Sequence, residues 1–172
     1  MITAFALAGA LWAQDPLSTE LRQSWGRTMN NVIGAAEKMP EGDYNFKPAA
    51  ESQSFKDLVA HTADSAMGQC SGYNGERKTA GARDMTSKAD LVGALKAAQA
   101  ECEKAYGSIT DAKAGEMIEG MRGGSRSRLG TLYGNAIHIE HEYAQMAVHL
   151  RLKGVVPPSS EGRGRMGGKK KN

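Results

Sequence analysis

Four segments of the chain have the apolar spacing of amphipathic helices, and each is bounded by residues that start or stop a helix. Asp15-Pro16 begins the first, the capping sequence Ser54-Phe-Lys-Asp57 begins the second, and Gly154 ends the fourth. No segment has a convincing strand pattern, and no internal repeat is visible. The expected helices cover residues 15–40, 54–72, 87–106 and 129–153. Four helices of about 20 residues in one domain predict an all-α four-helix bundle.

The two ends of the chain differ in composition from the part between them. Residues 2–13 are mostly apolar and precede the polar pair Gln14-Asp15, which resembles the core and cleavage site of a secretory signal peptide. Unlike most signal peptides, this stretch is not preceded by a positive charge. The alternative interpretation of residues 2–13 is a buried N-terminal helix. Residues 161–172 are rich in glycine and lysine, a composition typical of a disordered tail. We therefore expect a signal peptide (1–13), a helical bundle (14–160) and a basic tail (161–172).

The net charge of +3 at pH 7 arises in the tail, because residues 163–172 hold five basic residues and no acidic ones. The rest of the chain has 17 basic and 19 acidic residues. Such a body lacks the positive face that nucleic-acid binding requires. No apolar run reaches the roughly 18 residues of a membrane-spanning helix. Neither a nucleic-acid partner nor a membrane span is expected.

The chain has two cysteines, Cys70 and Cys102, which are too few and too far apart for a zinc motif built on cysteine. Cys70 follows His61 by nine residues, which places it on the opposite side of the same helix. Small buried cysteines are more often free than paired. We therefore expect two buried thiols; a disulfide, which export would allow, is the alternative.

The fourth expected helix carries residues that can bind a metal. On a helical wheel of about 100° per residue, one stripe contains His138, Glu142, Gln145 and His149. The two flanks are apolar: Ile139, Tyr143, Met146 and Leu150 on one side, and Ile137, Val148 and Leu152 on the other. The solvent side is expected to hold Glu140, Ala144, Ala147 and Arg151. The stripe should therefore face the bundle interior, where imidazole and carboxylate groups need hydrogen bonds or an ion.

His61, in the second expected helix, is the one histidine outside the fourth. His138 and Glu142 lie one turn apart, a spacing that suits two ligands of one ion, and His61 would supply a third from another helix. The pattern alone leaves two interpretations open. One is a metal site, and the other is a hydrogen-bonded core network without metal.

Three parts of the sequence together resemble the DinB/YfiT-like superfamily. They are Ser54-Phe-Lys-Asp-Leu-Val-Ala-His-Thr-Ala-Asp64, Cys70-Ser-Gly-Tyr-Asn-Gly-Glu76, and the segment from His138 through Leu-Arg-Leu-Lys-Gly-Val-Val-Pro-Pro158. The resemblance covers roughly residues 16–160. It implies an up-down-down-up four-helix bundle that commonly holds a divalent ion through three histidines, one on the second helix and two a turn apart on the fourth.

His61 and His138 match the first two of these positions. At the third, the family has histidine at 142 preceded by glutamate, whereas this chain reads His141-Glu142. Either Glu142 takes the place of the histidine, or a small helix rotation brings in His141, or the site binds nothing. We favour His61, His138 and Glu142, because Glu142 lies on the buried stripe and His141 lies about 60° from His138.

Two histidines and one carboxylate leave a coordination position open, which is typical of a catalytic ion. We expect a divalent ion (zinc, nickel, iron or manganese) in a metal-dependent hydrolase or transferase that acts on a small molecule, without assigning individual catalytic residues. The resemblance adds that relatives include thiol-dependent transferases and isomerases. The alternative is a non-catalytic exported binding module with a structural or vestigial metal site. The leader predicts a periplasmic or extracellular protein, and a homodimer is the assembly considered.

Overall fold

The structure, a computed structural model, describes residues 15–119 and 123–161. The expected signal peptide, and the expected basic tail apart from Glu161, lie outside these residues. The bundle consists of helices α1 (Pro16–Lys38), α2 (Phe55–Tyr73), α3 (Lys88–Ser108) and α4 (Arg128–Leu152). Both ends of every helix lie within two residues of the expected ends. The predicted all-α four-helix bundle is therefore confirmed.

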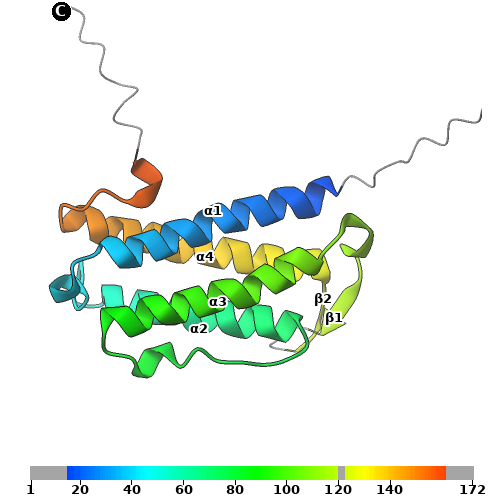
Figure 1. The fold of residues 1–172 in the computed structure, drawn as a ribbon, viewed down its shortest axis with the longest axis horizontal. Helices are drawn as coiled ribbons and strands as arrows, with labels where there is room; N and C mark the ends of the chain where they lie inside the picture. The colour runs from blue at the N-terminus through cyan, green and yellow to red at the C-terminus, as the bar shows by residue number, and fades with distance from the viewer. Residues whose placement is uncertain (1–14, 120–122, 162–172) are drawn as a thin grey trace, which may run out of the picture.

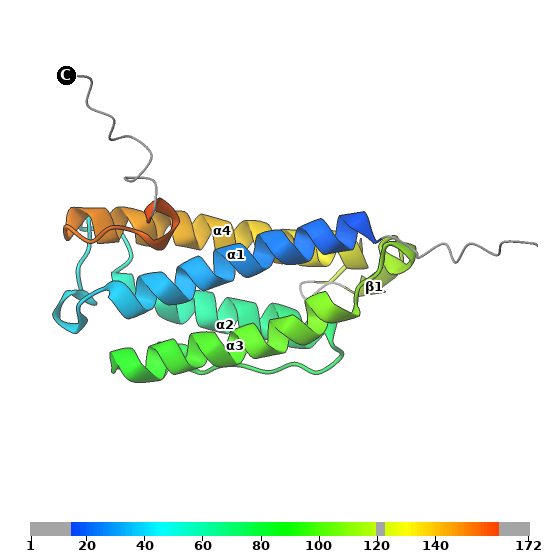
Figure 2. The same cartoon turned by 45° about the horizontal axis from the view of Figure 1, so that its top comes forward.

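The direction of the helices follows an up-down-down-up order. α1 and α4 run one way, and α2 and α3 run the other way (Figure 1). A long segment returns from the end of α2 to the start of α3, which allows these two helices to lie parallel (Figure 2). α4 packs against α1 and α2, and α3 packs against the same two helices. Residues on α4 that face α2 therefore meet a helix from a distant part of the sequence.

Local capping explains where α2 begins and where α4 ends. The Ser54 hydroxyl accepts a hydrogen bond from the Asp57 backbone N–H (3.1 Å), and the Asp57 carboxylate accepts one from the Ser54 backbone N–H (3.3 Å). A hydrogen bond from the Ser54 hydroxyl lowers the pKa of Asp57. After α4, Gly154 adopts a φ of +73°, a left-handed conformation that suits glycine. Both boundaries were predicted correctly.

The start of α1 is capped by a distant residue. Asp15 occupies the capping position, but its side chain makes no capping hydrogen bond. Instead Asp111, after α3, accepts hydrogen bonds from the backbone N–H groups of Leu17 (3.1 Å) and Ser18 (2.8 Å). Asp15 in turn accepts from the backbone N–H of Asp111 (2.8 Å). This exchange fixes the start of α1 against the end of α3.

A short hairpin between α3 and α4 was not expected. Strand β1 (Met117–Glu119) pairs antiparallel with β2 (Ser125–Ser127), and Met117 lies opposite Ser127. Strands of three residues are too short to produce a readable alternation of polar and apolar side chains. β2 ends where α4 begins, and the Ser127 hydroxyl accepts the capping hydrogen bond from the Gly130 backbone N–H (3.0 Å).

The core contains a disulfide bond, so the expectation of two free thiols is wrong. Cys70 of α2 and Cys102 of α3 are bonded, with their Cα atoms 4.9 Å apart. Both residues are fully buried. Because α2 and α3 run parallel and side by side, the two cysteines lie at the same height, and their Cα separation is within the range that a disulfide requires. The expectation that Cys70 is not a ligand agrees with this pairing.

The buried face of α4 is rotated from the expected one. Ile137, Val148 and Leu152 are 55%, 49% and 58% exposed, whereas Ala147 is buried. The expected burial of that apolar flank, and the expected exposure of Ala147, are therefore wrong. The buried arc is centred near Ile139, about 100° from His138. The stripe that holds His138 consequently lies at the edge of the buried face.

Candidate metal centre

Three side chains from two helices converge between α2 and α4: His61 on α2, and His138 and Glu142 on α4. One possible ligand atom from each lies within 4.8 Å of the other two. Glu142 Oε1 is 3.8 Å from His61 Nε2 and 3.7 Å from His138 Nδ1. The two imidazole rings meet edge to face, with centroids 5.1 Å apart. The structure therefore brings together the three residues favoured as ligands from the sequence.

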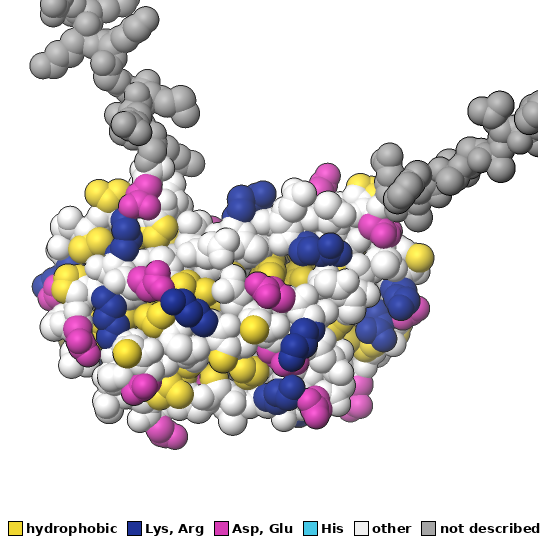
Figure 3. All heavy atoms as spheres, in the orientation of Figure 1, with side chains coloured by type: hydrophobic (Ala, Val, Ile, Leu, Met, Phe, Trp, Pro, Cys, Tyr) yellow, Lys and Arg dark blue, Asp and Glu magenta, His cyan; other side chains and the backbone are white. Residues whose placement is uncertain are grey.

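The position of this cluster at the edge of the buried face leaves it open on one side. The Glu142 side chain is only 6% exposed, whereas those of His61 and His138 are 30% and 29% exposed. The face drawn in Figure 3, over α1 and α3, displays no histidine, since the cluster belongs to another side of the molecule. A small molecule could therefore reach the histidines from solvent while the carboxylate stays held inside.

The donor set fits a divalent ion. Two ligands of a tetrahedral zinc lie about 3.4 Å apart when each bond is about 2.0–2.1 Å. The separations from Glu142 to the two histidines exceed this by a few tenths of an ångström, and all three ligand atoms lie within 4.8 Å of one another. Metal-binding histidines normally use the second ring nitrogen for an orienting hydrogen bond. His138 has that arrangement, because its Nε2 lies 3.2 Å from the Ser65 hydroxyl while Nδ1 faces Glu142.

The second oxygen of Glu142 is also held. Gln145 Nε2 donates a hydrogen bond of 3.3 Å to Glu142 Oε2. Oε1 is the oxygen that faces both histidines. Gln145 thus holds the carboxylate with one oxygen toward the centre of the cluster.

His141, the alternative third ligand, lies outside the cluster. Its side chain is exposed, and it is absent from the group whose ligand atoms converge. Moving His141 into the position of Glu142 would require α4 to turn by about 100°. Such a turn would expose the core residues Ile139 and Met146, both fully buried. Packing therefore places Glu142, and not His141, beside His61 and His138.

His149 lies on the same stripe but has a structural environment. Its Nδ1 faces the backbone oxygen of Gln145 (2.9 Å), and its Nε2 faces that of Gln53 (3.1 Å). The rings of Phe46 and Phe55 are each 6.0 Å away, centroid to centroid. Both nitrogens are thus directed at protein oxygens, and His149 connects the end of α4 to the loop before α2.

Two features near the cluster were missed from the sequence. Ser65, which contacts His138, lies four residues after His61 on α2. This spacing places the two residues on the same face of the helix and could have indicated Ser65 from the sequence. A polar cavity of about 360 Å³ beside His61 is lined by Gln53, Asp57, Ala60 and Arg83. Arg83 belongs to the segment between α2 and α3, and no local pattern in the sequence indicates where that segment passes.

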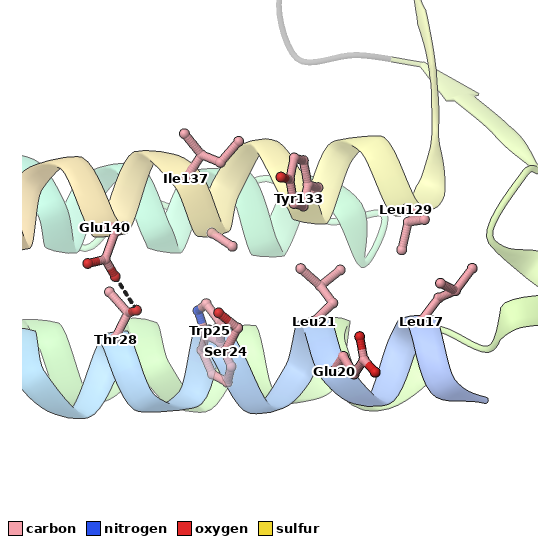
Figure 4. A pocket seen from close by; sticks show the side chains of 11 residues that line it. Leu17, Glu20, Leu21, Ser24, Trp25, Thr28, Leu129, Tyr133, Ile137 and Glu140 are labelled. Atoms are coloured by element: carbon pink, nitrogen blue, oxygen red, sulfur yellow. Dashed lines mark hydrogen bonds between the residues drawn. The ribbon is translucent and has the colours of Figure 1, made fainter. Parts of the chain in front are cut away.

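A second hollow lies on the other side of α4, between α4 and α1 (Figure 4). It has a volume of about 490 Å³ and a mostly apolar lining that includes Leu21, Trp25 and Ile137. Across it, the Thr28 hydroxyl donates a hydrogen bond of 2.5 Å to Glu140. Glu140 is exposed, as expected, but it also has this partner on α1.

The all-α four-helix bundle agrees with what is known of similar proteins. The sequence profile of the DinB superfamily matches residues 24–146. The chain belongs to the DinB superfamily. No curated protein matches it.

Solved structures show the same fold. A DinB-like protein from Bacillus cereus superposes with a TM-score of 0.67 at 18% identity, over 81% of this chain and 95% of that one. A conserved protein from Enterococcus faecalis gives 0.63 at 16% identity, over 78% and 95% of the two chains. A DinB-like protein from Bacillus subtilis gives 0.63 at 20% identity, over 78% and 92%. Among the described residues of this chain, no helix is long and apolar enough to span a membrane.

Proposed function

We propose that His61, His138 and Glu142 hold one divalent ion, and that the protein is a metal-dependent hydrolase or transferase acting on a small molecule. The observation that carries this proposal is the convergence of three ligand atoms within 4.8 Å, from helices far apart in the sequence. The partial exposure of both histidines supports an open coordination position rather than a closed structural site.

Each residue of the cluster has a defined part in this proposal. Ser65 orients the His138 ring, and Gln145 orients the Glu142 carboxylate. His61 joins α2 to the pair on α4 and faces the solvent-exposed side, where a substrate would enter. A divalent ion, when bound, supplies a Lewis acid that lowers the pKa of a coordinated water or thiol. The buried carboxylate contributes one negative charge, so the ion keeps a net positive charge toward the substrate.

The metal content of the purified full chain tests the proposal. Loading with zinc, nickel, iron or manganese, followed by elemental analysis, should find about one ion per chain. His138→Ala should abolish this binding. His141→Ala is the matched control, because His141 is an exposed histidine on the same helix, and it should retain the binding. Loss of binding in His141→Ala with retention in His138→Ala would contradict the ligand set. A tightly bound ion that no added small anion can reach would favour the non-catalytic binding module.

Removal of the ion should lower stability without unfolding the bundle. The ion links α2 to α4, and binding only to the folded state adds about 2.7 kcal/mol to the free energy of unfolding at a hundredfold excess over Kd. A chelator should therefore lower the melting temperature by several degrees, while the helical circular dichroism signal remains. Complete loss of helicity would show that the ion is required for folding.

We also propose that the protein is exported, to the periplasm or the extracellular space. Two observations support this: the apolar segment at residues 2–13, and the disulfide between Cys70 and Cys102, since disulfides persist in oxidising compartments. Mass spectrometry of the protein from its native host should find a chain that begins near Gln14. A mature protein that retains Phe5 and Leu7 would contradict cleavage.

A further inference from the structure

We propose that the polar cavity beside His61 is the substrate pocket of the metal centre, and that Arg83 binds a carboxylate of the substrate there. The substrate class would be small organic acids. This inference rests on the proposed metal site and adds to it a residue and a chemistry for recognition. The cavity, of about 360 Å³, is lined by His61 of the metal cluster and by Arg83, with Gln53 and Asp57 on the α2 side.

The segment that carries Arg83 is held in place against α2. The Asp64 carboxylate accepts hydrogen bonds from the backbone N–H of Ala82 (3.1 Å) and from the Thr79 hydroxyl (3.4 Å). Ala82 is fully buried, and Gly81 makes the turn before it with a φ of +64°. Arg83 therefore emerges next to α2 at a fixed place in the backbone.

No other described residue competes for the Arg83 side chain. Among the described residues, no hydrogen bond or ion pair joins its guanidinium to a carboxylate, although Asp57 lines the same cavity. Asp57 already accepts hydrogen bonds from the backbone N–H and the hydroxyl of Ser54. A guanidinium offers five N–H donors in a planar fork that matches a carboxylate, and it stays charged at every physiological pH. Arg83, which is exposed, thus offers its donors to a cavity of substrate size.

The charges around the cavity favour an anion once the ion is bound. Arg83 contributes one positive charge, while Asp57 and Glu142 contribute one negative charge each. A divalent ion at the cluster adds two positive charges and makes the sum positive, whereas without it the sum is negative. Carboxylate binding should therefore depend on both Arg83 and the ion.

The test uses succinate as the probe and calorimetry on the zinc-loaded full chain. Arg83→Met should weaken succinate binding by about tenfold or more, because it removes a charge-assisted, two-pronged hydrogen bond. Arg83→Lys should restore part of the affinity. Arg27→Met removes the same charge from an exposed position on α1, outside the cavity, and should leave succinate binding unchanged. Metal-free protein should bind succinate at least tenfold more weakly, roughly the effect of losing the ionic partner.

Asp57→Asn should change the succinate affinity in the opposite direction. This variant distinguishes a pocket that binds anions from one that binds cations. Removing the Asp57 charge should strengthen succinate binding several-fold, since a like charge leaves the cavity. Equal affinity in Arg83→Met and wild type, in protein that holds one zinc per chain, would overturn this proposal and leave the metal site standing. Weaker binding in Asp57→Asn at unchanged melting temperature would also overturn it. Protein that takes up no ion would overturn both proposals.

Discussion

The described part of the chain buries two carboxylates, Glu101 on α3 and Glu142 on α4, and their surroundings differ. Glu101 accepts a hydrogen bond from Asn74 (2.7 Å) and pairs with Lys104 (2.9 Å) and Lys78 (3.3 Å). Within the described part of the chain, Glu142 accepts a hydrogen bond from Gln145 and faces two histidines. Burial of a charge is costly unless cations and donors compensate it.

The difference explains why one carboxylate is structural and the other is a candidate ligand. The hydrogen bond from Asn74 and the two lysines lower the pKa of Glu101 to about 2. The positive charge at Glu101 is thus supplied by the chain itself. At Glu142 no lysine or arginine of the described residues is paired with the carboxylate, and a divalent ion would supply the missing charge. Substitutions around each carboxylate should separate the two environments.

The interface that holds Glu101, between α2 and α3, also contains the disulfide, whose loss should have the largest effect. The double variant Cys70→Ala/Cys102→Ala should lose about 4 kcal/mol of unfolding free energy, given a separation of 32 residues. Denaturant unfolding measures the loss. Wild type under reducing conditions is the control, because reduction breaks the bond and keeps every side-chain heavy atom. Two free thiols in denatured, unreduced protein would show that the bond is absent.

Substitution of Glu142 should mainly affect metal binding. Glu142→Gln should weaken zinc binding by about a hundredfold or more. Mutation of a residue that only hydrogen-bonds to a metal ligand already lowers metal affinity about 10–100-fold. Glu140→Gln is the matched control on the same helix: Glu140 faces α1 and accepts a hydrogen bond from Thr28 there. Zinc titration with a competing chelator measures both variants. Equal losses in the two would contradict the distinction between them.

Substitution of Glu101 should affect stability in a pH-dependent way and leave zinc binding unchanged. The folded-state pKa of about 2 lies below the ordinary value of 4.5, so the ionised carboxylate stabilises the fold above pH 4.5, and this contribution is lost as the pH falls toward 2. Glu101→Gln should therefore cost about 1–3 kcal/mol at neutral pH. The difference from wild type should shrink between pH 4.5 and 2, measured by denaturant unfolding. A constant difference across that range would contradict the ionic role.

The smallest effect is expected on the α1 side of α4. Thr28→Val removes the hydrogen bond to Glu140 at nearly constant volume, and should cost about 0.5–1.5 kcal/mol because the exposed Glu140 carboxylate regains water. Zinc affinity should not change. A loss of zinc binding in this variant would show that the two sides of α4 are coupled, and that the contrast between Glu140 and Glu142 is incomplete.

Local rules predicted much of the fold and two of the side chains that converge between α2 and α4. The capping box at Ser54 and the glycine at 154 involve residues close in sequence, and so does the one-turn spacing of His138 and Glu142. Their geometry follows from the helix itself. For the same reason Glu142 could be preferred over His141 before the structure was known.

Other features depended on how the helices lie against each other. Asp111 caps α1 from across the bundle, and Cys70 meets Cys102 because α2 and α3 are parallel neighbours. The rotation of α4 about its axis left Ile137 exposed and placed the histidine cluster at an accessible edge.

The sequence by itself therefore determined the helices, their boundaries and which side chains share a helical face, because each of these depends on interactions within a few residues. Only the tertiary structure decided which face is buried, which residue caps α1, which cysteines pair and which arginine lies beside His61. Those outcomes come from packing between segments far apart in the chain. The hydrophobic effect that drives such packing is not directional, so the pattern of one helix does not specify its partner or its exact rotation.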